Sequence, residues 1–238
     1  MLQNINPYKV LFLDLETVPK TEKWEELSSD LQDLWEKKTI YRRTKDEVPP
    51  GEFYENNAGI WAEFGKIVCI SVGFISSNNK IRIKSFYGND EYKLLVDFAG
   101  LLNTHFYSSQ SVLCAHNGKE FDFPFLARRM LILQIPLPNL LNLFGKKPWE
   151  VPHLDTMELW KFGDFKHFTS LNLLANILDI PTPKDDIDGS RVAEIYYKEK
   201  NLERIKVYCE KDVLTVAQIF RKMRYEPLLE QDLDTDEY

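Results

Sequence analysis

The chain is poor in cysteine, histidine and glycine. Its three cysteines are odd in number and lack C-x-x-C spacing, which argues against a disulfide framework and against a zinc knuckle. The cysteines are Cys69, Cys114 and Cys209. The one glycine pair that resembles a phosphate loop, in residues 59–66, has five residues between its glycines and Ile67 in place of Ser or Thr. No nucleotide-binding loop is therefore predicted.

Positive charge and long hydrophobic runs are also scarce. The 37 acidic residues outnumber the 30 lysines and arginines, and the net charge of −7 argues against a protein that coats long duplex DNA. No apolar run approaches the ~18 residues of a membrane span, and the first residues have no signal-peptide pattern. We therefore expect a soluble, cytoplasmic protein that makes no membrane contact.

An enzyme that grips only a few nucleotides needs no more than a local group of basic side chains. The candidates for such a basic track are Arg128, Arg129, Lys146, Lys147, Lys161 and Lys166. Nearby aromatic residues could stack on bases, although core packing is the more frequent role of such side chains. They are Trp160, Phe162, Phe165 and Phe168. The histidines have no metal-ligand spacing, so structural or surface roles are expected, with His116 close enough to Asn117 to approach a substrate. They are His105, His116, His153 and His167.

The apolar pattern predicts strands in the first half of the chain and helices in the second. A short apolar run at residues 10–13 is typical of a buried strand, and strand patterns return at 67–74 and 80–86, which predicts three antiparallel strands. Amphipathic spacing predicts a helix over 90–106, and a further strand follows at 111–115. We expect an α/β fold with a mixed sheet flanked by helices.

The remaining segments complete the domain. Helices are predicted near residues 121–133, 156–160, 170–178, 190–197 and 202–224. Residues 20–58 change character, with helix-like stretches followed by polar, proline-containing sequence, and we interpret them as an insertion. We therefore predict one domain over residues 1–225 that contains this insertion. Residues 226–238 are acidic and have no apolar face, so we expect a flexible tail that frays.

Five side chains from separate segments are expected to meet at one edge of the sheet. Asp14 and Glu16 end the first strand and share one face, because side chains two apart on a strand point the same way. Asp122 lies in the first turn of the helix after the 111–115 strand. Tyr208 and Asp212 are four residues apart on one helix face. Asp155, which precedes a predicted helix, could join this acidic edge.

A cluster made only of carboxylates selects hard cations, Mg²⁺ or Mn²⁺, over zinc. Without such cations the clustered carboxylates would repel one another. Two ions about 4 Å apart suit in-line attack at phosphorus, which predicts metal-dependent phosphodiester hydrolysis. Tyr208, with an ordinary pKa near 10, is a poor base at neutral pH, so we expect it to hold the attacking water in line.

Three motifs occur in order along the chain: Asp14-x-Glu16, then Asn117-x-x-x-Phe121-Asp122, then Tyr208-x-x-x-Asp212. In this order they resemble the DnaQ-like, or DEDD, 3′-5′ exonuclease superfamily. Position 207 is Val and position 208 is Tyr, as in the tyrosine subtype. The flanking sequences Phe-Asp-Phe-Pro-Phe-Leu and Tyr-Cys-Glu-Lys-Asp-Val resemble the proofreading domain of family B DNA polymerases and the stand-alone predicted polymerase-B-like 3′-5′ exonucleases. The resemblance covers residues 9 to about 222.

The resemblance implies a ribonuclease H-like fold and removal of nucleotides from a DNA 3′ end with two divalent ions, Mg²⁺ or Mn²⁺. It assigns Asp14 to both ions, Glu16 and Asp212 to the water-activating ion, and Asp122 to the other. It also implies contacts with the terminal nucleotides from Leu15, Thr17, Asn117 and Phe121. The insertion departs from a minimal exonuclease domain and leaves substrate choice open, because it could cover, widen or gate the cleft.

Two other functions remain open from the sequence. A 3′-5′ exoribonuclease on the same fold would differ only in how its pocket treats the 2′-hydroxyl, which no motif here reveals. A catalytically silent nucleic-acid-binding module would be favoured by loss of a metal ligand, yet all four carboxylates and the tyrosine are present. Because no polymerase segment is expected after Tyr238, proofreading of single-stranded or frayed DNA ends would occur through a separate polymerase or not at all. A repair role, with a separate repair partner, and an end-trimming role are equally open.

Overall fold

The protein is built around a six-stranded mixed sheet in the strand order β5-β4-β1-β2-β3-β6. The structure is a computed structural model and describes residues 2–43, 47–76, 79–164, 166–181 and 187–231. The strands are β1 (Val10–Pro19), β2 (Gly65–Ile75), β3 (Lys80–Tyr87), β4 (Val112–Ala115), β5 (Leu154–Asp155) and β6 (Glu230–Gln231). The strands β1, β2 and β3 pair antiparallel, as predicted, whereas β4 joins β1 in parallel and β5 joins β4 in parallel.

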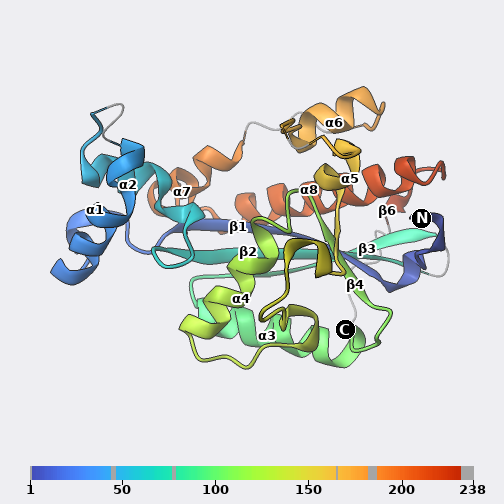
Figure 1. The fold of residues 1–238 in the computed structure, drawn as a ribbon, viewed down its shortest axis with the longest axis horizontal. Helices are drawn as coiled ribbons and strands as arrows, with labels where there is room; N and C mark the ends of the chain where they lie inside the picture. Colours follow the sequence, from blue (N-terminus) through green and yellow to red (C-terminus); the bar gives the residue numbers. More distant parts are fainter. Residues whose placement is uncertain (1, 44–46, 77–78, 165, 182–186, 232–238) are drawn as a thin grey trace.

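Helices cover both faces of this sheet. The α-helices are α1 (Ser29–Arg43), α2 (Pro50–Asn57), α3 (Glu91–His105), α4 (Asp122–Ile132), α5 (Thr156–Lys161), α6 (Leu171–Ile177), α7 (Val192–Glu194) and α8 (Leu202–Met223). Helices α3 and α4 pack on one face and α8 crosses the other (Figure 1). The predicted helices near residues 90, 121, 156, 170 and 202 are confirmed. The predicted helix at 190–197 is instead a 3-10 turn, the short α7 and a π-helical turn at Ile195–Glu199.

The central strand β1 supplies side chains to both cores because its residues alternate between the faces. Leu11, Leu13 and Leu15 are buried against α3 and α4, while Val10 and Phe12 are buried against α8. By the same alternation, the next even-numbered residues of β1, Asp14 and Glu16, face α8. The fold is thus the mixed α/β arrangement that the apolar pattern predicted.

The insertion folds as a lobe with its own aromatic core. Trp35 of α1 is fully buried and contacts the rings of four aromatic residues, which are Phe53, Tyr54, Trp61 and Phe64. Its indole Nε1 donates to the backbone oxygen of Pro50 at 3.0 Å. Pro50 begins α2, where its missing N–H costs nothing because the first amides of a helix have no partner within the helix.

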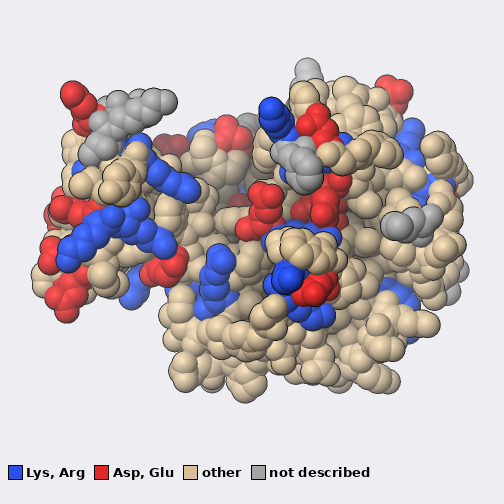
Figure 2. Space-filling view, viewed as in Figure 1, with Lys and Arg blue, Asp and Glu red and all other residues tan. Residues whose placement is uncertain are grey.

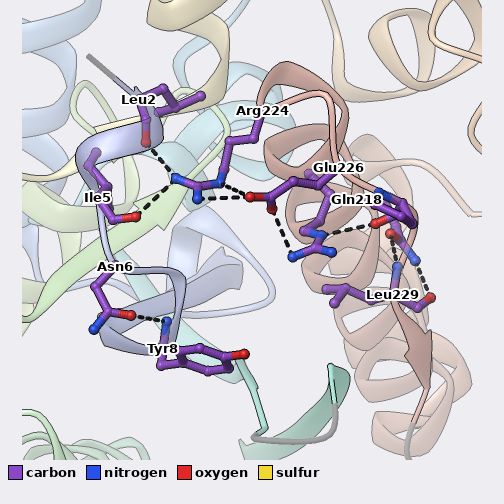
Figure 3. A network of polar contacts seen from close by, with 10 residues as sticks. Leu2, Ile5, Asn6, Tyr8, Gln218, Arg224, Glu226 and Leu229 are labelled. Carbon is purple, nitrogen blue, oxygen red and sulfur yellow. Dashed lines mark hydrogen bonds and ion pairs between the residues drawn. The ribbon is translucent and has the colours of Figure 1, made fainter.

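The start of the segment predicted to fray is packed against the domain. Arg221 and Arg224 both form ion pairs with Glu226, and Arg224 also donates to backbone oxygens near the N-terminus (Figure 3). Leu229 is buried and exchanges two hydrogen bonds with the side chain of Gln218. The prediction is therefore wrong for residues 226–231, while residues 232–238 lie outside the described part of the chain. Among the described helices, none has the length and apolar character needed to cross a membrane.

Candidate active site

The end of β1 carries the first two acids onto the face that α8 covers. Asp14 and Glu16 continue the alternation of Phe12, so both carboxylates point toward α8. A register shift between Glu16 and Thr17 follows directly, and irregularities of this kind re-aim strand side chains next to active sites. Oxygens of Asp14 and Glu16 and the sulfur of Cys209 all lie within 4.8 Å of one another.

Helix α8 places the third motif opposite these acids. Tyr208 and Asp212 are one turn apart and both line the same cleft as Asp14 and Glu16. The Tyr208 hydroxyl is hydrogen-bonded to the Asp212 carboxylate. Between them Cys209 is fully buried, and its thiol donates to the backbone oxygen of Asp14 at 3.3 Å. This hydrogen bond therefore connects α8 to β1, and no motif in the sequence predicted it.

The second motif forms a tight turn between β4 and α4. Asn117 adopts a left-handed backbone with φ of 63°, and Gly118 packs so closely that a Cβ there would lie 2.5 Å from the Cβ of Ala115. Glycine is required at position 118 for this reason. Asp122 then begins α4, is buried, and accepts a hydrogen bond from the backbone of Leu15 on β1. The turn thus delivers Asp122 to the acidic end of β1.

Asp155 holds this turn in place. Its carboxylate accepts hydrogen bonds from the backbone N–H of Asn117 at 2.9 Å and of Lys119 at 3.1 Å, and it also caps the start of α5. Asp155 is buried and its carboxylate is occupied by these amides, so it is better explained as a support for the turn than as another metal ligand. His116 is likewise structural, since its ring nitrogens bond Thr156 and Thr169.

The carboxylates in the cleft repel one another, and this repulsion adds to the effect of burial on their pKa values. Burial and the neighbouring Asp212 raise the pKa of Asp14 well above its ordinary value, and burial and Asp14 do the same to the pKa of Glu16. Burial raises the pKa of Asp122 to about 8. Burial, followed by the nearby Asp212, also raises the pKa of Tyr208, so this phenol stays protonated at neutral pH. The ionised cluster is therefore unfavourable unless positive charge is added.

The donor set fits divalent cations. Asp14 Oδ2 is buried and has no hydrogen-bond partner among the described residues, which leaves a lone pair for an ion. Cys209 lies within reach, but burial raises the pKa of its thiol well above the ordinary value, so it stays neutral and is a poor ligand. The available ligands are then the oxygens of Asp14, Glu16, Asp122 and Asp212, which suit Mg²⁺ or Mn²⁺.

The acids lie in a cleft of about 730 Å³ that has two walls. The two ends of the insertion and the residues just after it form one wall, which includes Glu22, Glu55 and Ile60, while residues 189–198 form the other. Tyr197 donates to the backbone oxygen of Pro19 at 2.6 Å and so joins the second wall to the end of β1. Sequence patterns revealed neither wall, because each consists of ordinary polar and apolar residues with no motif.

The predicted substrate residues are placed unequally. Leu15, Thr17 and Phe121 line the cleft together with Asp14, Glu16, Tyr208 and Asp212. Asn117 lies beside it rather than in its lining, and its side-chain oxygen is buried without a hydrogen-bond partner among the described residues. Asp122 is buried just behind the cleft surface. The structure therefore brings the five predicted catalytic residues together and leaves the role of Asn117 a prediction.

One residue of the predicted basic track was assigned wrongly, and two of the predicted aromatic residues are more exposed than expected. Arg129 is buried, pairs with Glu91 at 2.6 Å and donates to the backbone of Ala62, so it supports the core and cannot contact a ligand. Core packing was the expected role of Phe162 and Phe168, but their exposed fractions are 90% and 70%. Phe165 lies outside the described residues. Trp160 does pack against a core cluster.

The fold is a mixed α/β sheet of the ribonuclease H-like type, with an acidic cleft at the end of β1. The chain belongs to the family described as "Predicted 3'-5' exonuclease related to the exonuclease domain of PolB", which matches residues 60–238. This match begins after the insertion and does not include Asp14 and Glu16. It is the structure that places these two acids beside Tyr208 and Asp212.

Two archaeal DNA polymerases are similar to the chain. A "DNA polymerase" of Pyrococcus glycovorans is 26% identical over an alignment of 124 residues that covers 47% of this chain and 16% of that polymerase. The structure of the family B DNA polymerase of Pyrobaculum calidifontis matches 89% of this chain and 24% of its own length, with 15% identity and a TM-score of 0.51. The chain thus corresponds to a small part of each polymerase, and the structural likeness supports the fold.

Proposed function

We propose that the protein is a divalent-metal-dependent 3′-5′ exonuclease that hydrolyses phosphodiester bonds at the 3′ ends of single-stranded or frayed DNA. One observation carries this proposal: acids from β1, α4 and α8 converge on one cleft, where burial and mutual repulsion raise the pKa values of Asp14, Glu16 and Asp122. Such an arrangement is costly for stability and is expected where charge serves a reaction.

The four carboxylates would hold the ions, with Asp14 central because it interacts with both Asp122 and Asp212. When bound, Mg²⁺ or Mn²⁺ would supply positive charge to the phosphate and acidify a water molecule. Tyr208 would then position the attacking water. Its single hydroxyl proton is donated to the Asp212 carboxylate, so the hydroxyl oxygen would accept a hydrogen bond from the water and would not take a proton from it.

The cleft itself would select the end of a strand. Its volume of about 730 Å³ is in the range of ligand-binding pockets and is suited to a terminal nucleotide held between the insertion and residues 189–198. The apolar side chains of Leu15 and Phe121 are placed to contact a base or sugar there. We propose that these contacts favour a single strand over an intact duplex, and that a separate polymerase or repair protein presents the end.

An exoribonuclease is the second candidate function, and a catalytically silent binding module is the third. The completeness of the acidic cluster favours an enzyme over a silent module. DNA and RNA are distinguished by the experiment that tests the main proposal. Matched single-stranded DNA and RNA, labelled at either end, are digested with the purified protein in Mg²⁺, Mn²⁺ or EDTA, alongside Asp14→Ala.

Stepwise shortening from the 3′ end that requires metal and is lost in Asp14→Ala is the expected result. The ratio of DNA to RNA rates then assigns the sugar. Folded wild-type protein that cleaves neither polymer with either metal would overturn the exonuclease proposal and leave the binding module as the better account.

A further inference from the structure

A second groove lies directly beside the acidic cleft. It has a volume of about 800 Å³ and runs between α4, the loop of residues 137–151 and the end of α5. Its floor is apolar, with Ala127 and Leu131 from α4 facing Leu141 and Phe144 from the loop. Neither the catalytic motifs nor the acidic cluster uses this groove.

The groove carries positive charge that the fold does not neutralise. Arg128, Lys146 and Lys161 line it, and none of the three has an ion pair among the described residues. Among the acids along the groove, Glu158 pairs with Lys119 at 2.6 Å, whereas Glu120 and Asp164 have no lysine or arginine partner among the described residues. The lining has four cations, Lys119, Arg128, Lys146 and Lys161, against three acids, so it keeps a small excess of positive charge although the whole protein is acidic.

Exposed aromatic rings accompany these cations. Phe144 lies in the groove and is 69% exposed, and Phe162 next to Lys161 is 90% exposed. Phe162 also has a left-handed backbone, with φ of 45°, which is uncommon for a bulky residue and presents its side chain at the end of α5. Cations interleaved with exposed rings are the usual composition of a surface that binds single-stranded nucleic acid.

One turn of the chain joins the groove to the cleft. Phe121 lines the acidic cleft, whereas its neighbours Lys119, Glu120 and Phe123 line the groove. Asp155 holds this turn through two backbone amides, so the two sites have a fixed spacing. Figure 2 shows acidic and basic side chains gathered next to each other near the middle of one face. A strand whose end lies in the cleft can continue across this turn into the groove.

We propose that this groove binds the part of a single-stranded nucleic acid that precedes the terminal nucleotide. Arg128, Lys146 and Lys161 contact its phosphates, and Phe144 stacks on one of its bases. The inference rests on the proposed function and adds the path of the substrate strand. The three unpaired cations favour a polyanion over a peptide as the occupant.

The test is a binding measurement with catalytically inactive Asp212→Asn protein in EDTA, by fluorescence anisotropy of labelled oligothymidylates from a dinucleotide to a decanucleotide. The groove variant is Arg128→Glu, Lys146→Glu and Lys161→Glu combined. Its matched control is Lys37→Glu, Lys84→Glu and Lys222→Glu, which changes the net charge equally at positions outside the groove lining. A second groove variant carries Gln at the same three positions and removes the positive charge without adding negative charge. Thermal unfolding of every variant is measured to detect misfolding.

The groove variant is expected to bind the decanucleotide about tenfold or more weakly than the control does, with a slope of log affinity against log salt that is smaller by about two. Affinity for the dinucleotide should fall much less, because that ligand occupies the cleft alone. Equal affinities for groove and control variants would overturn the groove proposal while leaving the exonuclease proposal intact, and would point to a protein partner for this surface. Failure of the parent protein to bind any of the oligothymidylates would overturn the groove proposal, whereas the exonuclease proposal is overturned only by the digestion experiment in Mg²⁺ or Mn²⁺.

Discussion

The acidic cleft and the neighbouring groove lie on the two sides of the turn at residues 117–123, yet they are built in opposite ways. The cleft takes its acids from β1, α4 and α8, where strand and helix geometry fix each carboxylate, and it buries like charges together. The groove takes most of its side chains from a loop and a helix end, and its cations and aromatic rings are largely exposed. Precise chemistry is placed on rigid elements, whereas adaptable contacts to a flexible polymer are placed on loops.

The largest effect is expected from the cleft. Asp14→Asn should lower the rate of hydrolysis by about three orders of magnitude, because Asp14 interacts with both Asp122 and Asp212 and its removal disrupts the whole cation site. The same change should raise the melting temperature in EDTA, because it removes a buried, repelled charge. Rates and unfolding curves are compared with those of Asp97→Asn, an exposed acid on α3. Activity close to that of wild type would contradict the placement of the site.

A change of pH should separate the two regions as well. In the folded, metal-free protein the pKa of Asp122 is about 8, compared with 3.8 for the ordinary carboxyl. The folded state therefore binds the proton more tightly than the unfolded state does, and the stability present below about pH 4 is lost progressively as the pH rises to about 8. Unfolding in EDTA measured over this range should show the decline, and Asp122→Asn should flatten it. An unchanged slope in that variant would assign the decline to other groups.

Removal of one hydroxyl in the cleft should have an intermediate effect. Tyr208→Phe keeps the ring that packs beside Cys209 but loses the hydroxyl that Asp212 orients, so kcat is expected to fall about a hundredfold with little change in KM. Steady-state kinetics test this, with Tyr225→Phe as the control because that tyrosine is 92% exposed. A change confined to KM would mean that Tyr208 contacts the substrate and does not orient the water.

The smallest effect is expected in the groove. Phe144→Ala should weaken binding of a single-stranded decanucleotide by about 1–3 kcal/mol, the range for one lost base stack. Thermal stability should be unchanged because Phe144 is 69% exposed. Tyr107→Ala, which removes a ring that is 73% exposed elsewhere on the surface, serves as the control. Equal losses in both variants would show that any exposed ring contributes and that the groove has no special role.

The placement of the acids in the cleft was predictable because it depends on local periodicity. Asp14 and Glu16 share a face by the two-residue repeat of a strand, and Tyr208 and Asp212 share one by the turn of a helix. The order of strands and helices followed from the same periodicities. These relations involve only neighbours in sequence, and the structure retains them.

Long-range partners were the source of the errors and omissions. Arg129 was assigned to a basic track, but its neutralising partner Glu91 is 38 residues away in sequence. Asp155 was a candidate for the acidic edge, but the backbone amides that occupy it belong to a turn formed from another segment. These partners of Arg129 and Asp155 lie 36 to 38 residues away, beyond any local window of sequence. Residues 226–231 were also expected to fray, but they pack against Gln218 and Arg221, which are near in sequence and are brought into contact only because the chain turns back after α8.

The sequence by itself determined the elements, the identity of the acids and the facing of each acid on its own strand or helix, because these depend on repeats of two and 3.6 residues. Only the tertiary structure decided which acids meet, how deeply they are buried and which walls enclose them. It also paired Arg129 while leaving Arg128 available to a ligand. The physical reason is that burial and charge pairing arise between segments brought together by packing, and their energies depend on distances that sequence separation does not specify.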